Sequence, residues 1–194
     1  MKRPKKKVFT WRGETFTDPY KVIEAVFDFT DILSYRNFIR DIIIYSEKNK
    51  RYQKESVGIL IGKLEAISCL LDSCFSISKE KKRSTLNICD NDIMNEKFYS
   101  GNEDKNYIWS DFPRLLSIEE FIDPYSVFKK IFRHMASREY NESFKELIGH
   151  ACGNYNDRFS GNIMNIYFQL TKLFEAAHLI YIREIVHIRN WRNP

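Results

Sequence analysis

The sequence contains few of the residues that interrupt regular secondary structure. Only 7 glycines and 5 prolines occur among its 194 residues. This scarcity excludes a collagen-like chain and a loop-rich architecture, because both need glycine or proline in quantity. Hydrophobic residues make up 43% of the chain and charged residues 29%, an ordinary globular composition that excludes disorder for the bulk of the chain. At this length we expect one domain or two small ones.

Cysteine is scarce as well, and its spacing fits neither a disulfide framework nor a zinc site. No paired spacing and no CxxC motif occurs among the four cysteines, which are Cys69, Cys74, Cys89 and Cys152. Cys69 and Cys74 lie on one expected helix with their side chains about 140° apart. The sequence therefore predicts reduced thiols in an intracellular protein.

Long apolar runs are absent. No segment approaches the roughly 20 apolar residues that a transmembrane helix needs, so we expect no membrane partner. The N-terminus is basic, but residues 8–13 do not begin an apolar core of about 7–15 residues, which argues against a signal peptide. A cytoplasmic location is predicted, or a nuclear one if the host has a nucleus.

Sequence motifs that carry chemistry are also missing. No phosphate-binding glycine loop, Gly-x-Ser-x-Gly elbow or His-Glu-x-x-His metal motif occurs. Glu-x-x-His pairs end at His178 and His187, but both lie on one expected helix and on opposite faces. Di-iron bundles bring such pairs together from different helices. We therefore expect no catalytic residue, no cofactor and no metal ion.

The first 17 residues are predicted to form a basic arm followed by a small β-hairpin. Five of the first seven residues are basic, namely Lys2, Arg3, Lys5, Lys6 and Lys7. Such an arm is a solvated tail, a nuclear-import signal or a segment that contacts phosphates. The following residues alternate around Arg12 and Gly13, which predicts a two-residue turn with Phe9 opposite Phe16. A lone hairpin is marginal in water, so this one needs helices to pack against.

From residue 18 onward the apolar residues recur at helical spacing. Asp18 is a suitable N-cap, and Pro19 suits the first helical position, where its missing N–H has no partner to lose. A second helix is expected after Ser34 as its cap, and a long third helix from about residue 55. The basic run at 79–83 ends this third helix, where positive charge complements the helix dipole.

An internal repeat is the most informative pattern in the chain. The ten residues 18–27 reappear as residues 123–132 with five identities, and both copies begin with Asp-Pro-Tyr. Tandem duplication explains this similarity, and two independent helices that share a good N-cap are the alternative. If the repeat is real, each half is a three-helix unit too small to bury much core alone. The two units would then pack together about a pseudo-twofold axis.

Residues 84–117 break the helical pattern and are predicted to form a polar linker. A calcium loop at Asp90 is excluded because Asn95 stands where the loop needs glycine. The sequence thus predicts an all-α protein in which two tandem pseudo-repeated three-helix units pack as one helical bundle. The expected segments are a basic arm with a hairpin (1–17), repeat 1 (18–83), the linker (84–117) and repeat 2 (118–194).

Basic and aromatic side chains are the candidate binding residues. The chain has 31 lysines and arginines against 26 acids, a net charge of +5 that permits an anionic partner without requiring one. Cations beside aromatic residues are typical of single-strand binders, although they are also typical of solvated helix ends. The nucleic-acid candidates are Lys2, Arg3, Lys5, Lys6, Lys7, Lys50, Arg51, Arg189 and Arg192. The candidates for contact with a protein partner are Trp11, Tyr107, Trp109 and Trp191.

The resulting hypothesis is a non-catalytic binding or assembly protein that engages a protein partner, a second copy of itself or a nucleic acid. Aromatic residues make up 15% of the chain, and surplus aromatic surface often marks an interface. The alternative is a small helical nuclease, such as a HEPN-like ribonuclease or toxin, that uses His134, His150 or His187 with nearby arginines. Those enzymes place four to six residues between an arginine and a histidine, but only three separate Arg183 from His187. Histidines and arginines that converge in one cleft would favour this alternative.

Overall fold

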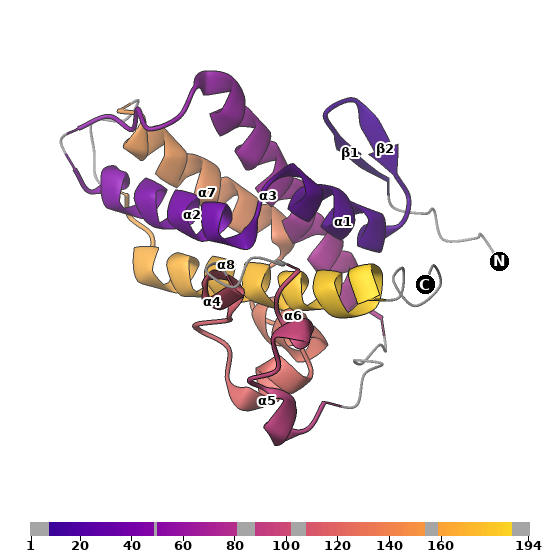
Figure 1. The fold of residues 1–194 in the computed structure, drawn as a ribbon. Helices are drawn as coiled ribbons and strands as arrows, with labels where there is room; N and C mark the ends of the chain where they lie inside the picture. The colour runs from indigo at the N-terminus through magenta and orange to yellow at the C-terminus, as the bar shows by residue number, and fades with distance from the viewer. Residues whose placement is uncertain (1–7, 49, 81–87, 102–107, 154–158, 188–194) are drawn as a thin grey trace.

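The computed structural model describes residues 8–48, 50–80, 88–101, 108–153 and 159–187. The fold is all-α apart from one two-stranded antiparallel sheet at the N-terminus, which confirms the predicted class (Figure 1). Its principal elements are β1 (Phe9–Trp11), β2 (Glu14–Phe16), α1 (Pro19–Phe29), α2 (Ile32–Ser46), α3 (Val57–Ser78), α4 (Ile108–Asp111), α5 (Ile118–Ile122), α6 (Tyr125–Ile131), α7 (Ser137–Ala151) and α8 (Ile163–Ile180). Two short 3-10 helices, η1 (Asp90–Asp92) and η2 (Glu96–Phe98), and a π-helix, η3 (Tyr181–Val186), complete the fold.

The predicted hairpin is confirmed together with its register. Phe9 pairs with Phe16, and Trp11 pairs with Glu14. Arg12 and Gly13 at the turn have φ angles of 50° and 81°, and positive φ at both central residues is the requirement of a type I′ turn. β1 packs on α3 and β2 on α1, so the hairpin obtains the helical support that it needs.

The starts of α1 and α2 follow the capping rules with one correction, whereas α6, which follows the second Asp-Pro-Tyr motif, has Pro124 as its N-cap and no side-chain cap hydrogen bond. The Asp18 side chain accepts a hydrogen bond from the Tyr20 N–H, and Pro19 is the first residue of α1. The prediction of Ser34 as the cap of α2 is wrong. Asp31 caps this helix by accepting hydrogen bonds from the Ser34 N–H at 2.6 Å and the Ser34 hydroxyl at 3.0 Å. Asp31 directly precedes Ile32, the first residue of α2, and takes the capping role that was expected of Ser34.

The long helices form one bundle around a shared core. α1 packs on α3, α6 packs on α8 and α3, and α2 packs on both α7 and α8 (Figure 1). Aromatic rings fill the centre, where Tyr35 of α2 lies 4.7 Å from Phe174 of α8 between ring centroids. Tyr20 and Tyr125, the third residues of the two Asp-Pro-Tyr motifs, are neighbours that interact with each other. The tandem duplication itself stays a prediction.

Part of the segment expected to be a linker packs back onto the bundle, as its aromatic residues indicate. Residues 108–122, which we call the strap, comprise α4, α5 and the chain between them, and they lie against α2 and α8. A second, smaller apolar cluster forms there, in which Ile88, Tyr99 and Phe121 pack on Leu179 of α8. No helix in the described ranges is long and apolar enough to cross a membrane.

Candidate functional site

Most of the residues predicted to bind a partner lie outside the described residues. These are the basic residues Lys2, Arg3, Lys5, Lys6, Lys7, Arg189 and Arg192 and the aromatic residues Tyr107 and Trp191. Four predicted site residues are described, namely Trp11, Lys50, Arg51 and Trp109. These four occupy three different places on the molecule.

Lys50 and Arg51 lie on the exposed connection between α2 and α3. The Tyr52 N–H donates to the Ala151 carbonyl at 2.7 Å, which fixes this connection to the end of α7. Gly153 follows α7 with φ of +74°, and a Cβ there would lie 2.9 Å from the Arg51 side chain. Lys48 and Lys54 lie over the Tyr45 ring at 5.3 and 5.8 Å. The connection is therefore a basic and aromatic end of the bundle.

Trp109 stands on the outer surface of the strap and is 60% exposed. The segment that carries it is fixed, because Arg36 of α2 donates to the carbonyls of Ser110 at 2.5 Å and Phe112 at 3.0 Å. The Trp109 ring lies 5.9 Å from the Phe112 ring between centroids. An exposed indole thus projects from a main chain that a buried arginine holds in place.

Buried charges hold the rest of the strap in the same way. Glu175 of α8 is fully buried and forms an ion pair with Arg36 at 2.9 Å. Its two carboxylate oxygens accept the main-chain N–H groups of Arg114 and Leu115, each at 2.9 Å. Charge-assisted hydrogen bonds of this kind are about twice as strong as neutral ones. The strap is therefore bound through its main chain rather than through its side chains alone.

Two further buried charges extend this network toward α5 and η3. Glu120 accepts hydrogen bonds from Lys130 at 2.9 Å and Lys172 at 2.8 Å. Burial favours the protonated form of Glu120, but the two lysines outweigh burial and hold the pKa of its carboxyl at about 2. Arg183 is 1% exposed and donates to the carbonyls of Phe98 at 2.8 Å and Phe121 at 2.5 Å. Burial lowers the pKa of its guanidinium to about 9.

The strap covers only half of the face that α2 and α8 form together. Arg36, Arg40 and Ile44 follow one another at four-residue spacing on α2 and so share one side of that helix. On α8, spacings of seven and four residues place Glu175, Phe168 and Met164 on one side of the helix. Arg36 and Glu175 are buried under the strap, whereas the other four residues are exposed. We call these four residues, together with Trp109 at the edge of the strap, the open face.

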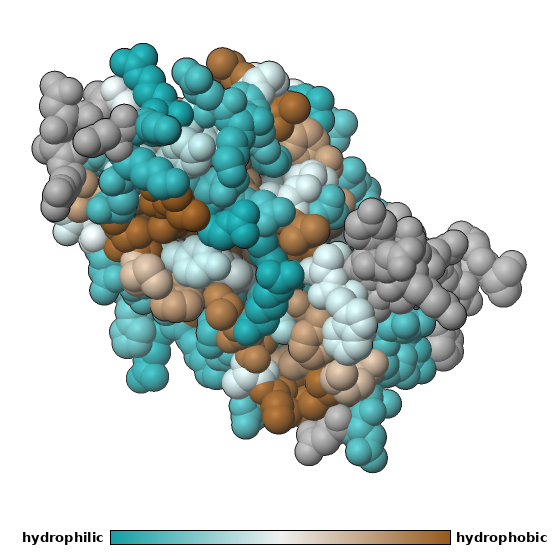
Figure 2. Space-filling model, turned by 60° about the vertical axis from the view of Figure 1, so that its left-hand side comes forward, coloured by the Kyte–Doolittle hydropathy of each residue, from teal (hydrophilic) through white to brown (hydrophobic). Residues whose placement is uncertain are grey.

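The open face carries exposed apolar side chains. Phe168 is 43% exposed, and Ile44 and Met164 are also among the exposed large apolar side chains. The C-terminal end of α2 and the N-terminal end of α8 lie on the same side of the molecule (Figure 1). Figure 2 brings this side forward, and brown apolar surface is visible there between white and teal areas. Arg40, whose side chain is 54% exposed, adds a positive charge and forms an ion pair with Asp41 at 3.6 Å.

One histidine lies near two arginines, as the nuclease alternative requires, but all three are interior. Burial, then Arg36 and Arg183, lower the pKa of His178 to about 3, so its imidazole is neutral at physiological pH. Both arginines donate hydrogen bonds to main-chain carbonyls of the strap, Arg36 to that of Ser110 and Arg183 to that of Phe121. His134, in contrast, is exposed, and His150 is buried beside Phe159. The arginines near His178 thus serve the fold.

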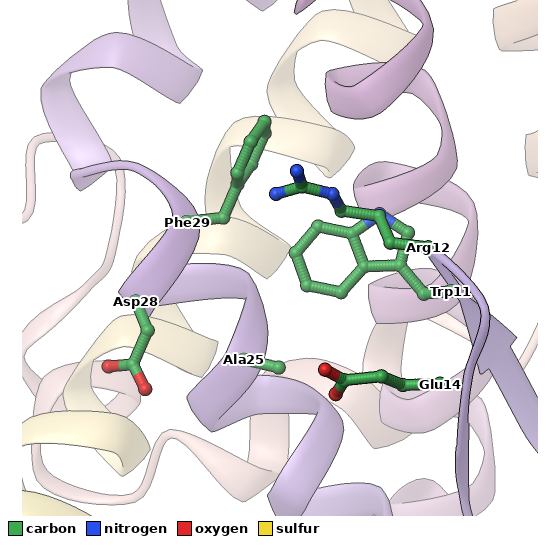
Figure 3. Close-up of a pocket in the computed structure, with 6 residues that line it drawn as sticks. All are labelled: Trp11, Arg12, Glu14, Ala25, Asp28 and Phe29. Atoms are coloured by element: carbon green, nitrogen blue, oxygen red, sulfur yellow. The ribbon is translucent and has the colours of Figure 1, made fainter.

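Trp11 is not a surface residue. It is 5% exposed, and its ring meets Phe29 edge-to-face at 5.4 Å. It lines a cleft of about 510 Å³ between the hairpin and α1 together with Arg12, Glu14, Ala25, Asp28 and Phe29 (Figure 3). On the other side of the hairpin, Trp11 also lines a cleft of about 350 Å³ that reaches α3 and Lys145 of α7.

Sequence reasoning missed the buried charges and three apolar residues of the open face. Glu175 stands inside the apolar run of α8, and that isolated carboxylate is a signal that a partner must be buried with it. Ile44, Met164 and Phe168 have no such signal, because an exposed and a buried apolar residue look alike in a sequence. Within the described ranges, no group of three or more histidine, cysteine, aspartate or glutamate side chains could hold a metal ion.

Comparison of the chain with protein-family models, with curated proteins and with solved structures found no match.

Proposed function

We propose that the protein is a non-catalytic binding protein that engages a partner protein through the open face. The observation that carries this proposal is Trp109, which is 60% exposed on a segment whose main chain is anchored by Arg36. Tryptophan is enriched among the residues that dominate binding energy at protein interfaces. Because the strap is already fixed, a partner would not have to order Trp109 on binding, which reduces the entropic cost of association.

A protein partner is favoured over a nucleic acid by the character of the described surface. The open face combines three exposed apolar side chains, Ile44, Met164 and Phe168, with the exposed Arg40. Interfaces between proteins combine an apolar centre with a polar rim in this way. Lys50 and Arg51 are the predicted nucleic-acid contacts that the structure describes. They belong to the α2–α3 connection and not to the open face.

The charge of the chain distinguishes between kinds of protein partner. Its net charge of +5 opposes association with a second copy at low ionic strength. Arg40 favours acidic side chains on the facing surface. The partner that fits best is therefore a different protein, with an apolar anchor for the surface around Phe168 and acidic residues beside that anchor.

Site-specific photo-crosslinking in the native cells tests the proposal. A benzophenone side chain introduced in place of Trp109 should capture one defined protein, and combining it with Phe168→Ser and Met164→Ser should remove the product. The matched control carries the benzophenone at position 138, because Arg138 is 87% exposed on α7, away from the open face. Circular dichroism and urea unfolding should confirm that each variant is folded.

Four outcomes are decisive. A defined protein lost with the two serine substitutions supports the proposal. A crosslinked dimer of the chain would replace the acidic partner by a second copy. A crosslink to nucleic acid would replace the protein partner altogether. Equal products from positions 109 and 138 would show that the open face has no special role.

A further inference from the structure

The first turns of α3 expose apolar side chains at one end of the bundle. Val57, Ile59 and Ile61 are 70%, 48% and 50% exposed, and we call these three residues the α3 tip. Gly58 stands among them, and nothing packs within 4 Å of the position that a Cβ would take there. α3 begins at the top of the molecule in Figure 1, and Figure 2, turned about the vertical axis, shows brown apolar surface at that upper end. Exposed apolar side chains that cluster in this way mark sites of contact with proteins or membranes.

The tip is exposed because it extends beyond the elements that cover the rest of α3. Ile59 belongs to a row of residues that continues at helical spacing with Ala66 and Leu70, and both of these are fully buried. Further along the helix this row packs on the bundle, so Ile59 is in water because the first turn overhangs. Ser56 caps α3 by accepting the Ile59 N–H at 3.5 Å, so the overhanging turn is a formed helix.

The apolar side chains of the tip point to opposite sides of α3. At 100° per residue, Ile59 points about 160° away from both Val57 and Ile61. A folded protein partner contacts one side of a helix end, so it would leave the other side in water. The apolar part of a bilayer surrounds whatever enters it, and a helix that is apolar all round is typical of a protein core or a membrane. The two-sided tip therefore favours a lipid surface over a protein surface.

Positive charge lies directly beside the tip. The α2–α3 connection, residues 47–56, contains four basic residues and two acidic ones. Lys48, Lys50 and Arg51 are exposed, whereas Glu55, one of the two acids, is held in an ion pair with a lysine of α3. Basic residues beside an apolar contact are attracted to anionic lipid headgroups. The net charge of +5 on the whole chain acts in the same direction.

We propose that the α3 tip inserts into the surface of a membrane that contains anionic lipids. The three apolar side chains of the tip enter the boundary between headgroups and acyl chains, and the basic residues of the α2–α3 connection lie among the headgroups. The sequence predicts no membrane partner because no segment can span a bilayer, but a contact of this kind is peripheral and needs no span. It does not depend on the function proposed for the open face.

Sedimentation with sucrose-loaded vesicles measures the partition of the full chain into lipid. Vesicles of phosphatidylcholine with about one third phosphatidylserine provide the anionic surface, and phosphatidylcholine alone provides the neutral one. The chain should bind the anionic vesicles at millimolar lipid, about tenfold or more tightly than the neutral vesicles, and less tightly as salt rises. The basic residues in positions 2–7 would produce the same dependence on charge, so variants of the tip are needed to locate the contact.

Ile61→Ser and a matched control locate the contact. Ile61→Ser should weaken binding to the anionic vesicles about fivefold, because the exposed half of the isoleucine side chain no longer passes from water into lipid. Ile118→Ser should leave binding unchanged, since Ile118 is 56% exposed in the first turn of α5, at the bottom of the molecule in Figure 1. Adding Ile59→Ser to Ile61→Ser should weaken binding about fivefold again, because both sides of the tip enter lipid. Circular dichroism confirms that each variant is folded.

The other outcomes would overturn the proposal in different ways. Equal losses with Ile61→Ser and Ile118→Ser would mean that the tip has no special role. A loss with Ile61→Ser that Ile59→Ser does not increase would mean that only one side of the tip is covered, as a protein partner would cover it. Binding that is lost on removal of residues 1–7 and is unaffected by the tip variants would assign the contact to the N-terminal arm. No binding to anionic vesicles at any lipid concentration would exclude a membrane.

Discussion

The covered and the open halves of the α2–α8 face use different chemistry although they lie on the same two helices. Under the strap the helices present Arg36 and Glu175, which bind main-chain groups of the covering segment. Beyond the strap the same sides present Arg40, Ile44, Phe168 and Met164. A segment of the same chain is recognised through its main chain by buried charges. The open half offers apolar side chains, the usual contacts of an interface between separate proteins.

The difference also concerns stability. Charges buried under the strap were removed from water on folding, and their ion pair and hydrogen bonds offset the loss of hydration. When one member of this set of buried charges is removed, the lost hydration of the remaining charge is no longer offset. Exposed apolar groups on the open half contribute little to folding, since they remain in contact with water in the free protein. Mutations under the strap should therefore lower the free energy of unfolding more than mutations on the open half do.

The largest effect is expected from Glu175→Ala. This change leaves Arg36 buried without its carboxylate and removes the acceptor of two main-chain N–H groups. We expect the free energy of unfolding to fall by about 3–5 kcal/mol in urea titrations. Faster amide hydrogen exchange at Arg114 and Leu115 should accompany this loss.

Glu65→Ala is the matched control for this prediction, because Glu65 is also a glutamate inside a long helix, α3, but is exposed. It should change the free energy of unfolding by no more than about 0.5 kcal/mol. Where Glu175→Ala is too unstable to measure, Glu175→Gln retains one acceptor oxygen and should show an intermediate loss. A loss below about 1 kcal/mol for Glu175→Ala would show that the strap is held by other contacts.

The second effect depends on pH. The pKa of Glu120 falls from 4.5 to about 2 in the folded protein, because hydrogen bonds from Lys172 and Lys130 outweigh burial. The stability that this carboxylate contributes is therefore complete above pH 4.5 and is lost as the pH falls from 4.5 toward 2. This contribution of Glu120 to the free energy of unfolding is about 3 kcal/mol at most.

Urea titrations of the wild type and Glu120→Gln at several pH values measure this contribution. The difference between the two proteins should be largest near pH 7 and should shrink below pH 4.5. Asp111 acts in the opposite direction, since burial raises the pKa of its carboxyl, so the difference between proteins is more informative than either curve alone. A constant difference across this range would mean that Glu120 does not carry the charge that holds α5 to α8.

The sequence predicts the architecture better than it predicts the binding surfaces. The two-residue turn at Arg12-Gly13 and the cap at Asp18 are local signals, and both are confirmed. The cap of α2 was misassigned because serine and aspartate cap equally well and lie close together at Asp31 and Ser34. Turn and N-cap residues predict local structure. They do not identify the cap where two nearby residues can accept the same hydrogen bond.

The binding surfaces depend on contacts between distant segments, which spacing does not encode. A polar composition at 84–117 predicts a linker, yet the main chain of its second part is held by residues 60 or more positions away. Trp11 and Trp109 are equivalent in a sequence, but one lies under the hairpin and the other on the strap. Only the packing of β1 on α3 and of α4 on α2 distinguishes them.

A smaller effect on stability, with a large effect on binding, is expected from Trp109→Ala. Because the ring is 60% exposed, its removal should lower the free energy of unfolding by less than about 1 kcal/mol. If the indole is a central contact of the partner, the affinity should fall about thirtyfold or more. Calorimetry with the crosslinked partner measures the affinity, and urea unfolding measures the stability. A change in stability without a change in affinity would remove Trp109 from the proposed interface.

The smallest effect on folding is expected from Phe168→Ala, and it gives the sharpest comparison of the two halves. Phe168 and Phe174 are the same residue type on the same helix, but Phe168 is 43% exposed and Phe174 is fully buried against Tyr35. Phe174→Ala should cost about 3–5 kcal/mol because it leaves a cavity. Phe168→Ala should cost no more than about 0.5–1 kcal/mol and should weaken partner binding. Similar losses for both would mean that the exposed ring supports the fold, and the open face would then have no need of a partner.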